Sequence, residues 1–154
     1  MSILKYFNKI QPQLEEPTKT ITRINQTHRV WTDGSCFNNG KKGAIGGIGV
    51  FFHDNSDCNI SEPLVVENGA VTNNKCELEA VRRAILAVIG KTDFHYDDTI
   101  LVYTDSQYLI NSVNKWSNTW SKNGWMRKNT KGNKVPVKNV ELIKEIKGLC
   151  GKYQ

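Results

Sequence analysis

The sequence has no apolar run near 18 residues, the length that a membrane-spanning helix needs. Its N-terminus also has no apolar stretch ahead of a small-residue cleavage site, as a secretory signal would have. With 38% hydrophobic and 23% charged residues, the 154-residue chain has the composition of one ordinary globular domain. We therefore expect a soluble protein with a single buried core.

Cysteine is scarce, and its spacing matches no common framework. The four cysteines form no CxxC pair, which argues against a zinc site and against a disulfide scaffold. We expect free thiols in a reducing compartment inside the cell, the cytoplasm or the nucleus. The residues are Cys36, Cys58, Cys76 and Cys150.

Acidic residues are absent from 106–140, and this gap is the most informative one. The same segment holds seven bases, whereas the rest of the chain has fourteen bases against fifteen acids. The formal net charge of +6 is therefore concentrated in one segment. Such a cluster attracts a polyanion, with nucleic acid as the first candidate, and the alternative is a solvated surface. The bases are Lys115, Lys122, Arg127, Lys128, Lys131, Lys134 and Lys138.

The pattern of apolar residues and turns predicts a flexible N-terminal tail over 1–27 and a mixed domain over 28–154. The tail is polar and interrupted by proline. In the domain, alternating and short apolar runs predict strands, and apolar residues at helical spacing predict helices. The expected strands are 29–36, 46–53, 63–71 and 99–103, and the expected helices are 74–89, 106–116 and 138–149.

The order of these elements predicts an α/β, or α+β, fold around a mixed sheet. Short connections make the first three strands an antiparallel meander. A right-handed crossover through the helix at 74–89 then places the fourth strand parallel to one of them. Asn73 or Asn74 is expected to cap that helix, and Gly90 to end it.

Three acids occupy positions where such a fold would gather them. Asp33 and Asp105 each end an apolar strand after a threonine, and Glu77 lies in the first turn of the helix between those strands. Sites form at the carboxyl ends of strands in open sheets. Three adjacent carboxylates repel one another, and a hard divalent cation such as magnesium removes that cost.

Each acid alone has a simpler interpretation. Asp33 could form a turn before Gly34, Asp105 could cap a helix, and Glu77 could interact with a helix dipole. The three acids together, beside a basic segment rich in tryptophan, favour a site instead.

At this point several motifs, in order and spacing, resemble type 1 ribonuclease H over about residues 29–152. The stretches are Thr32-Asp33-Gly34-Ser35-Cys36, Asn39-Gly40, Gly46-Gly47-Ile48-Gly49-Val50, Thr72-Asn73-Asn74-Lys75-Cys76-Glu77-Leu78, Thr104-Asp105-Ser106-Gln107-Tyr108, Trp116 to Trp125 and Pro136-Val137-Lys138-Asn139.

The resemblance implies a ribonuclease H-like fold and cleavage of the RNA strand of an RNA–DNA hybrid. It further implies two Mg²⁺ ions, with Mn²⁺ as a substitute, that clamp the scissile phosphate. In that family pattern Asp33 bridges both ions. Glu77 and Asp105 hold the ion on the leaving-group side.

The resemblance also implies contacts to each strand of the hybrid. Asn39 and Asn74 match residues that meet RNA 2′-hydroxyl groups, which distinguish RNA from DNA. Tyr108 and Trp116 match an aromatic pair that lines the DNA-strand channel, although packing in the core is an alternative for Trp116 and Trp120. The residues that form a DNA phosphate-binding pocket in the family are matched here by Thr72, Asn73 and Asn139.

A basic handle that grips the hybrid backbone completes the implied contacts. Such a handle gives salt-dependent affinity without choosing a sequence. The matching residues are Trp120, Lys122, Trp125, Arg127 and Lys128.

The chain departs from the family pattern in two ways. Ala70 stands where some relatives have an arginine in the phosphate pocket, which predicts a weaker pocket. A fifth strand, a histidine-bearing loop and a helix with a fourth metal-binding aspartate would lie beyond Gln154. The expected domain is therefore truncated at its C-terminus, and its fourth strand is expected to be an exposed edge.

The truncation leaves three hypotheses. The first is a ribonuclease H, the second a module that binds hybrids without cutting them, and the third a related polynucleotidyl transfer enzyme. The N-terminal Ile3, Tyr6 and Phe7 also resemble a degenerate sliding-clamp-binding peptide, with docking on the domain or disorder as the alternative.

Overall fold

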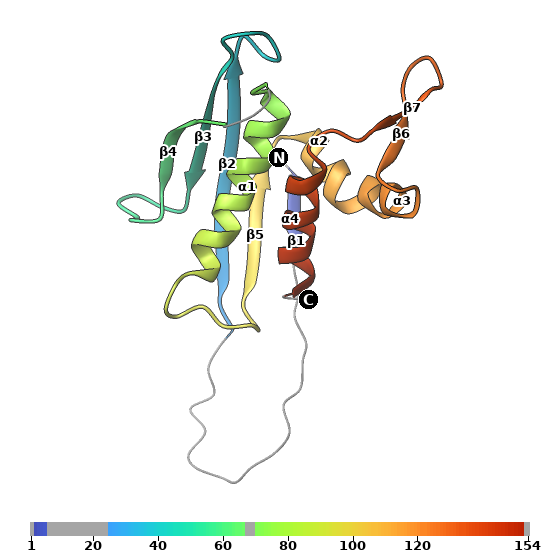
Figure 1. The fold of residues 1–154 in the computed structure, drawn as a ribbon. Coiled ribbons are helices and arrows are strands. Elements are labelled where there is room, and N and C mark those ends of the chain that lie inside the picture. Colours follow the sequence, from blue (N-terminus) through green and yellow to red (C-terminus); the bar gives the residue numbers. More distant parts are fainter. Residues whose placement is uncertain (1, 6–24, 67–69, 153–154) are drawn as a thin grey trace, which may run out of the picture.

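The computed structural model describes residues 2–5, 25–66 and 70–152, and these residues form one sheet with helices on one face (Figure 1). The principal strands are β1 (Ser2–Lys5), β2 (Thr27–Phe37), β3 (Ile45–Phe51), β4 (Ile60–Leu64) and β5 (Thr99–Thr104). A small hairpin is formed by β6 (Met126–Lys128) and β7 (Lys134–Pro136). The helices are α1 (Asn73–Ile89), α2 (Gln107–Asn111), the π-helical turn η1 (Ser112–Trp116), α3 (Ser117–Lys122) and α4 (Val140–Lys152).

The described strands of the main sheet follow the order β1-β5-β2-β3-β4. The strands β2, β3 and β4 form an antiparallel meander, and β5 pairs in parallel with β2. This register places Trp31 opposite Tyr103, so Asp33 and Asp105 lie two residues further on, just past the last β2–β5 pair. Asp105 follows its strand as predicted, but Asp33 does not end β2, which continues to Phe37 because it stays paired with β3. The predicted mixed sheet and ribonuclease H-like topology are confirmed.

The core lies between the sheet and helices α1 and α4, which cover one of its faces (Figure 1). Alternate residues of β5 are buried, including Ile100 and Val102, as one-sided burial of a sheet predicts. Leu78, Val81 and Val88 of α1 lie in the same cluster, because residues at this spacing share one helix face.

Several boundaries differ from the sequence-based predictions. The third meander strand is Ile60–Leu64 rather than 63–71, and its Pro63 suits an edge strand because proline cannot donate to a ladder. The cap of α1 is Thr72, whose hydroxyl accepts a hydrogen bond from the Lys75 N–H, whereas Asn73 is already helical. The helix predicted at 106–116 continues to Lys122 through η1.

The expectation that β5 would be an exposed edge was wrong. Strand β1 lies along that edge in antiparallel orientation, with Ser2 opposite Thr104 and Lys5 opposite Leu101. Residues 2–5 of the predicted tail therefore form a strand. Residues 6–24, which include Tyr6 and Phe7 of the clamp-like motif, lie outside the described residues. This pairing has no signature in the sequence, because it is made by backbone groups that every segment carries.

None of the described helices is both long and apolar enough to cross a membrane.

Candidate active site

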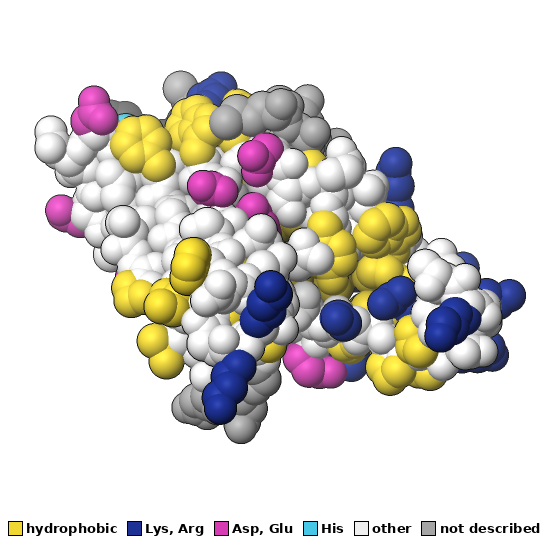
Figure 2. All heavy atoms as spheres, turned by 90° about the horizontal axis from the view of Figure 1, so that it is seen from above, with side chains coloured by type: hydrophobic (Ala, Val, Ile, Leu, Met, Phe, Trp, Pro, Cys, Tyr) yellow, Lys and Arg dark blue, Asp and Glu magenta, His cyan; other side chains and the backbone are white. Residues whose placement is uncertain are grey.

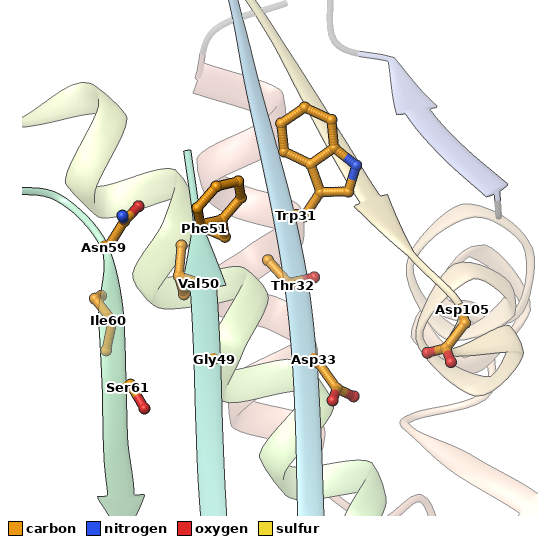
Figure 3. Close-up of a pocket in the computed structure, with 10 residues that line it drawn as sticks. All are labelled: Trp31, Thr32, Asp33, Gly49, Val50, Phe51, Asn59, Ile60, Ser61 and Asp105. Atoms are coloured by element: carbon orange, nitrogen blue, oxygen red, sulfur yellow. The ribbon is translucent and has the colours of Figure 1, made fainter. Parts of the chain in front are cut away.

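The three predicted acids meet just past the point where the pairing of β2 with β5 ends. One carboxylate oxygen from each of Asp33, Glu77 and Asp105 lies within 4.8 Å of the others. Asp33 belongs to β2 and Asp105 follows β5, and their side chains extend toward each other (Figure 3). Glu77 reaches the same place as the fifth residue of α1, just beyond the first turn in which the sequence placed it, because the helix begins at Asn73 and its first turn holds no acid.

Close packing of β2 against α1 depends on Gly34. A Cβ atom at this position would lie 2.3 Å from the Glu77 backbone nitrogen and 2.4 Å from the Cys76 carbonyl carbon. Real side chains do not approach backbone atoms so closely, so only glycine fits here. The Gly34 N–H also donates to Asp33 Oδ1 at 2.8 Å, which orients that carboxylate. Gly34 therefore makes room for the helix that carries Glu77.

The cluster is electrostatically unfavourable without a counter-ion. Burial first, and then the charges of Asp33 and Asp105, raise the pKa of the Glu77 carboxyl to about 7, against a smaller opposing effect of the Gly34 amide. Glu77 Oε2 is buried and accepts no hydrogen bond within the described part of the chain. Buried polar atoms are nearly always paired, so this one needs a ligand.

A hard divalent cation satisfies these requirements. Three carboxylates supply the oxygen ligands that Mg²⁺ and Mn²⁺ prefer, and a cation would remove the mutual repulsion and pair the orphaned oxygen. Asp33 and Asp105 are exposed, so an ion and a substrate phosphate can both reach them. The donor set therefore fits the metal site that the sequence predicted.

A hollow of about 520 Å³ extends from Asp33 and Asp105 over the face of the sheet opposite the helices (Figure 3). Its other walls are largely apolar and include Trp31 and Phe51, whose ring centroids lie 6.2 Å apart. Trp31 also stacks on Tyr103 at 4.9 Å. Sequence reasoning assigned no role to these aromatic residues.

A larger cleft, of about 980 Å³, gathers most of the predicted substrate-binding residues. It begins within one helical turn of the acids, because α1 carries both Glu77 and Asn74, and Tyr108 follows Asp105 by three residues. We call it the substrate cleft. Its predicted members are Asn39, Thr72, Asn74, Tyr108, Trp116, Trp120, Arg127 and Asn139.

One wall of the substrate cleft is the start of α1, where polar groups are already ordered. Asn39 Oδ1 accepts a hydrogen bond from the Asn73 N–H at 3.1 Å, which leaves the Asn39 side-chain NH₂ group to donate elsewhere. The first N–H groups of a helix also attract anions. This wall therefore offers several donors to a nucleic-acid backbone.

The opposite wall is aromatic. Trp116 lies 6.2 Å from Tyr108 and 5.5 Å from Trp120, measured between ring centroids. Trp116 remains 40% exposed, whereas Trp120 and Tyr108 pack partly against the core. The core-packing alternative thus describes Trp120 better than Trp116, and Trp116 presents a surface on which a sugar or base can stack.

The bases of the 106–140 segment lie on the surface beside this wall. Figure 2 shows acidic side chains near the centre of one face and Lys or Arg side chains with hydrophobic ones at its right. Arg127 and Lys128 are exposed on β6. Trp125 fixes the hairpin through its backbone. Its backbone N–H donates to the Trp120 carbonyl oxygen at 2.7 Å, and its carbonyl oxygen accepts from the Val137 backbone N–H.

Not every predicted contact lines the substrate cleft, and some lining residues were missed. The predicted Asn73, Lys122, Trp125 and Lys128 are outside its lining, although all lie on the elements around it. Gly40, Lys75 and Lys138 do line it. All three belong to the motifs or the basic cluster already identified, so their position in those stretches was the available signal.

Comparisons with known proteins agree with this geometry. The RNase H family model matches residues 25–154. Ribonuclease H of Schizosaccharomyces pombe is 40% identical over 114 residues, 74% of this chain and 38% of the relative. Ribonuclease HI of Neisseria meningitidis serogroup B is 35% identical over 131 residues, 85% of this chain and 79% of the relative.

Solved structures show the same fold. The foamy viral protease-reverse transcriptase in complex with dsDNA superposes with a TM-score of 0.54 at 26% identity, covering 79% of this chain and 72% of that one. LC9-RNase H1, a type 1 RNase H with the type 2 active-site motif, superposes with a TM-score of 0.53 at 26% identity, covering 82% of this chain and 59% of that one. Sequence, fold and the placement of the acids thus lead to one conclusion, that this chain belongs to the ribonuclease H family.

Proposed function

We propose that this chain hydrolyses the RNA strand of RNA–DNA hybrids with divalent metal ions, Mg²⁺ first, held by Asp33, Glu77 and Asp105. The observation that carries the proposal is the meeting of three carboxylates within 4.8 Å, with the Glu77 oxygen unpaired, at the end of the substrate cleft. The likeness to ribonucleases H supports the choice of reaction.

The carboxylates hold the catalytic ions and set their positions. When bound, such ions activate a water nucleophile and stabilise charge on the leaving oxygen. Asp33 is exposed and its carboxylate lies within 4.8 Å of those of Glu77 and Asp105, so the three side chains together would hold the ions. The Gly34 N–H holds one oxygen of Asp33 and so limits its rotation.

The substrate cleft aligns the hybrid so that the RNA strand reaches the acids. Asn39 and Asn74 line the substrate cleft, where their amides can bond to 2′-hydroxyl groups. Tyr108 and Trp116 form the aromatic wall for the DNA strand, whose sugars lack that hydroxyl. Selectivity for RNA in the scissile position therefore comes from the two amides.

A DNA phosphate is held at the start of α1, near Thr72, Asn73 and Asn139. The Thr72 hydroxyl oxygen caps the helix by accepting from the Lys75 N–H at 3.3 Å, and its own O–H can still donate to a phosphate oxygen. Exposed bases on α3 and β6, including Lys122, Arg127 and Lys128, add attraction to the hybrid backbone. A contact of the N-terminal segment with a sliding clamp stays a prediction, and the comparisons give it no support.

The test is cleavage of an end-labelled hybrid by the purified chain in Mg²⁺. Asp33→Asn preserves size and removes one charge, and we expect it to lower the cleavage rate by at least about 100-fold. Asp57→Asn, an exposed acid in the turn after β3, is the matched control and should cut normally.

Two outcomes would contradict the proposal. Equal rates for wild type and Asp33→Asn would show that another nuclease or another site is responsible. Tight hybrid binding by the wild type without any cleavage would favour the non-catalytic binding module instead.

A further inference from the structure

Two of the cysteines meet directly behind the acid site. Cys76 lies in a small buried cluster with Ile48, Val71 and Ala80, and Cys36 packs against that cluster. The Cys36 thiol donates a weak hydrogen bond to the Val71 carbonyl at 3.4 Å. The sequence spacing of these cysteines predicted no pairing, so the proximity comes from the packing of β2 against α1.

Three contacts around the glycines Gly34 and Gly46 bring the two thiols together. Cys36 pairs with Gly46 across β2 and β3, which makes them neighbours on one face of the sheet. A Cβ atom on Gly46 would lie 2.7 Å from Cys76 Sγ. The Cys76 sulfur therefore occupies the space, next to Cys36, that a side chain at position 46 would need. Gly34, two residues before Cys36 on the same face, touches the Cys76 backbone.

We propose that Cys36 and Cys76 are a redox-sensitive pair that closes to a disulfide joining β2 to α1. Disulfides join cysteines with Cα atoms about 4.4–6.8 Å apart, and the contacts of Gly34 and Gly46 show that the backbones around the two thiols are closely packed. Cys36 is partly exposed and meets the oxidant first, whereas Cys76 is fully buried and acts as the resolving thiol.

The oxidant we name is a small disulfide such as glutathione disulfide, which exchanges with thiolates. Cys36 loses its proton and attacks one glutathione sulfur; the other leaves as a thiolate and takes that proton. Cys76 then attacks Cys36 Sγ, and the second glutathione leaves with the Cys76 proton. Two protein thiols are oxidised to one disulfide, and one glutathione disulfide is reduced to two thiols.

Closing this bond would disturb the acids. Cys36 follows Asp33 by three residues and Cys76 precedes Glu77, so the bond ties the two segments that carry them. Forming an S–S bond of about 2.05 Å pulls the thiols together, yet Gly34 leaves no room for α1 to move straight toward β2. The first turn of α1 must shift sideways, and a misplacement near 1 Å can cost about 100-fold in rate.

The test uses the full native chain, treated with glutathione disulfide, alkylated and digested with trypsin. Every cysteine falls in a different tryptic peptide, namely 30–41 for Cys36, 43–75 for Cys58, 76–82 for Cys76 and 148–152 for Cys150. We expect peptide 30–41 linked to peptide 76–82 in the oxidised sample only, and its loss after dithiothreitol. The link should be absent in Cys36→Ser and present in Cys58→Ser.

The same samples are assayed on the hybrid. We expect oxidation to slow cleavage by at least 10-fold and dithiothreitol to restore it, while Cys36→Ser resists the oxidant. Links between other peptides, or no link at all, would overturn the proposal, and so would the expected link with an unchanged rate. The rate readout rests on the proposed function. A reduced chain that cuts nothing contradicts that function, while the peptide map still decides whether the thiols pair.

Discussion

At the scale of single residues, Gly34 is the position where the fold and the site depend on each other most directly. It lets α1 approach β2 so that Glu77 reaches Asp33. We expect Gly34→Ala to lower the free energy of unfolding by at least ~2 kcal/mol, because its Cβ would overlap two backbone atoms that cannot move independently.

The matched control for Gly34→Ala is Gly49→Ala on β3. There the nearest atom to an added Cβ is the Asp33 carbonyl oxygen at 3.8 Å, an ordinary contact. Urea unfolding of both variants measures the difference. Similar stability of the two variants would show that α1 adapts to a larger side chain.

Glu77 gives the clearest pH dependence. Its pKa in the folded chain is about 7, above the ordinary 4.5, so between these values the folded state holds more protons than the unfolded state. The metal-free stability therefore falls as pH rises through that window and levels off above it. The loss due to Glu77 is on the order of 2 kcal/mol, after discounting for its partial exposure.

Urea unfolding in chelator at pH 5, 6, 7 and 8 checks this prediction. Glu77→Gln cannot ionise, so the stability difference between it and the wild type should grow in favour of the variant toward pH 8. A difference that does not change with pH would mean that neither burial nor the charges of Asp33 and Asp105 disfavour the Glu77 carboxylate in the metal-free protein.

At the scale of elements, β1 protects the parallel strand β5. The four paired residues, from Ser2 to Lys5, cover an edge that would otherwise present its backbone groups to another chain. A chain that starts at Asn25 should self-associate at tens of micromolar and unfold at a lower temperature than the full chain.

Light scattering after size exclusion measures this self-association. Adding Leu101→Lys to the shortened chain should restore the monomer, because a charge on an edge strand opposes pairing. A shortened chain that stays monomeric, with an unchanged unfolding temperature, would contradict a protective role for β1.

The β6–β7 hairpin carries the second prediction at this scale. Arg127 and Lys128 are exposed on β6, and each phosphate contact that is lost should reduce the salt dependence of binding by about 0.9 in the log–log slope. Replacing both with glutamine should lower the slope for hybrid binding by up to about 2, without a preference for sequence.

Fluorescence titrations at several salt concentrations measure this slope. Lys91→Gln, beyond the far end of α1, is the control and should leave the slope unchanged. An unchanged slope in the double variant would place the hybrid on another face of the molecule.

At the scale of the whole molecule, the parts predictable from sequence were those with local patterns. The acids could be placed because Asp33 and Asp105 each come after an apolar run and a threonine, and parallel pairing of β2 with β5 then brings them together. The β1–β5 pairing depends on backbone groups distant in sequence, and the Cys36–Cys76 contact depends on two glycines that remove bulk. Neither leaves a periodic signal in the chain.

The same distinction explains the substrate cleft. Its members come from stretches that the family resemblance marked, but their convergence required the turn through η1, which carries Trp116 beside Tyr108. A π-helical turn has no sequence rule as strong as a cap or a hydrophobic period, so the predicted helix ended too early.

The central claim is that this chain is a metal-dependent nuclease selective for RNA paired with DNA. The most direct measurement compares initial rates on an RNA–DNA hybrid, an RNA duplex and a DNA duplex of one sequence, each with Mg²⁺ and with chelator. We predict cleavage of the RNA strand of the hybrid alone, abolished by chelator. Cleavage of the DNA duplex, or hybrid cleavage that continues in chelator, would contradict the account.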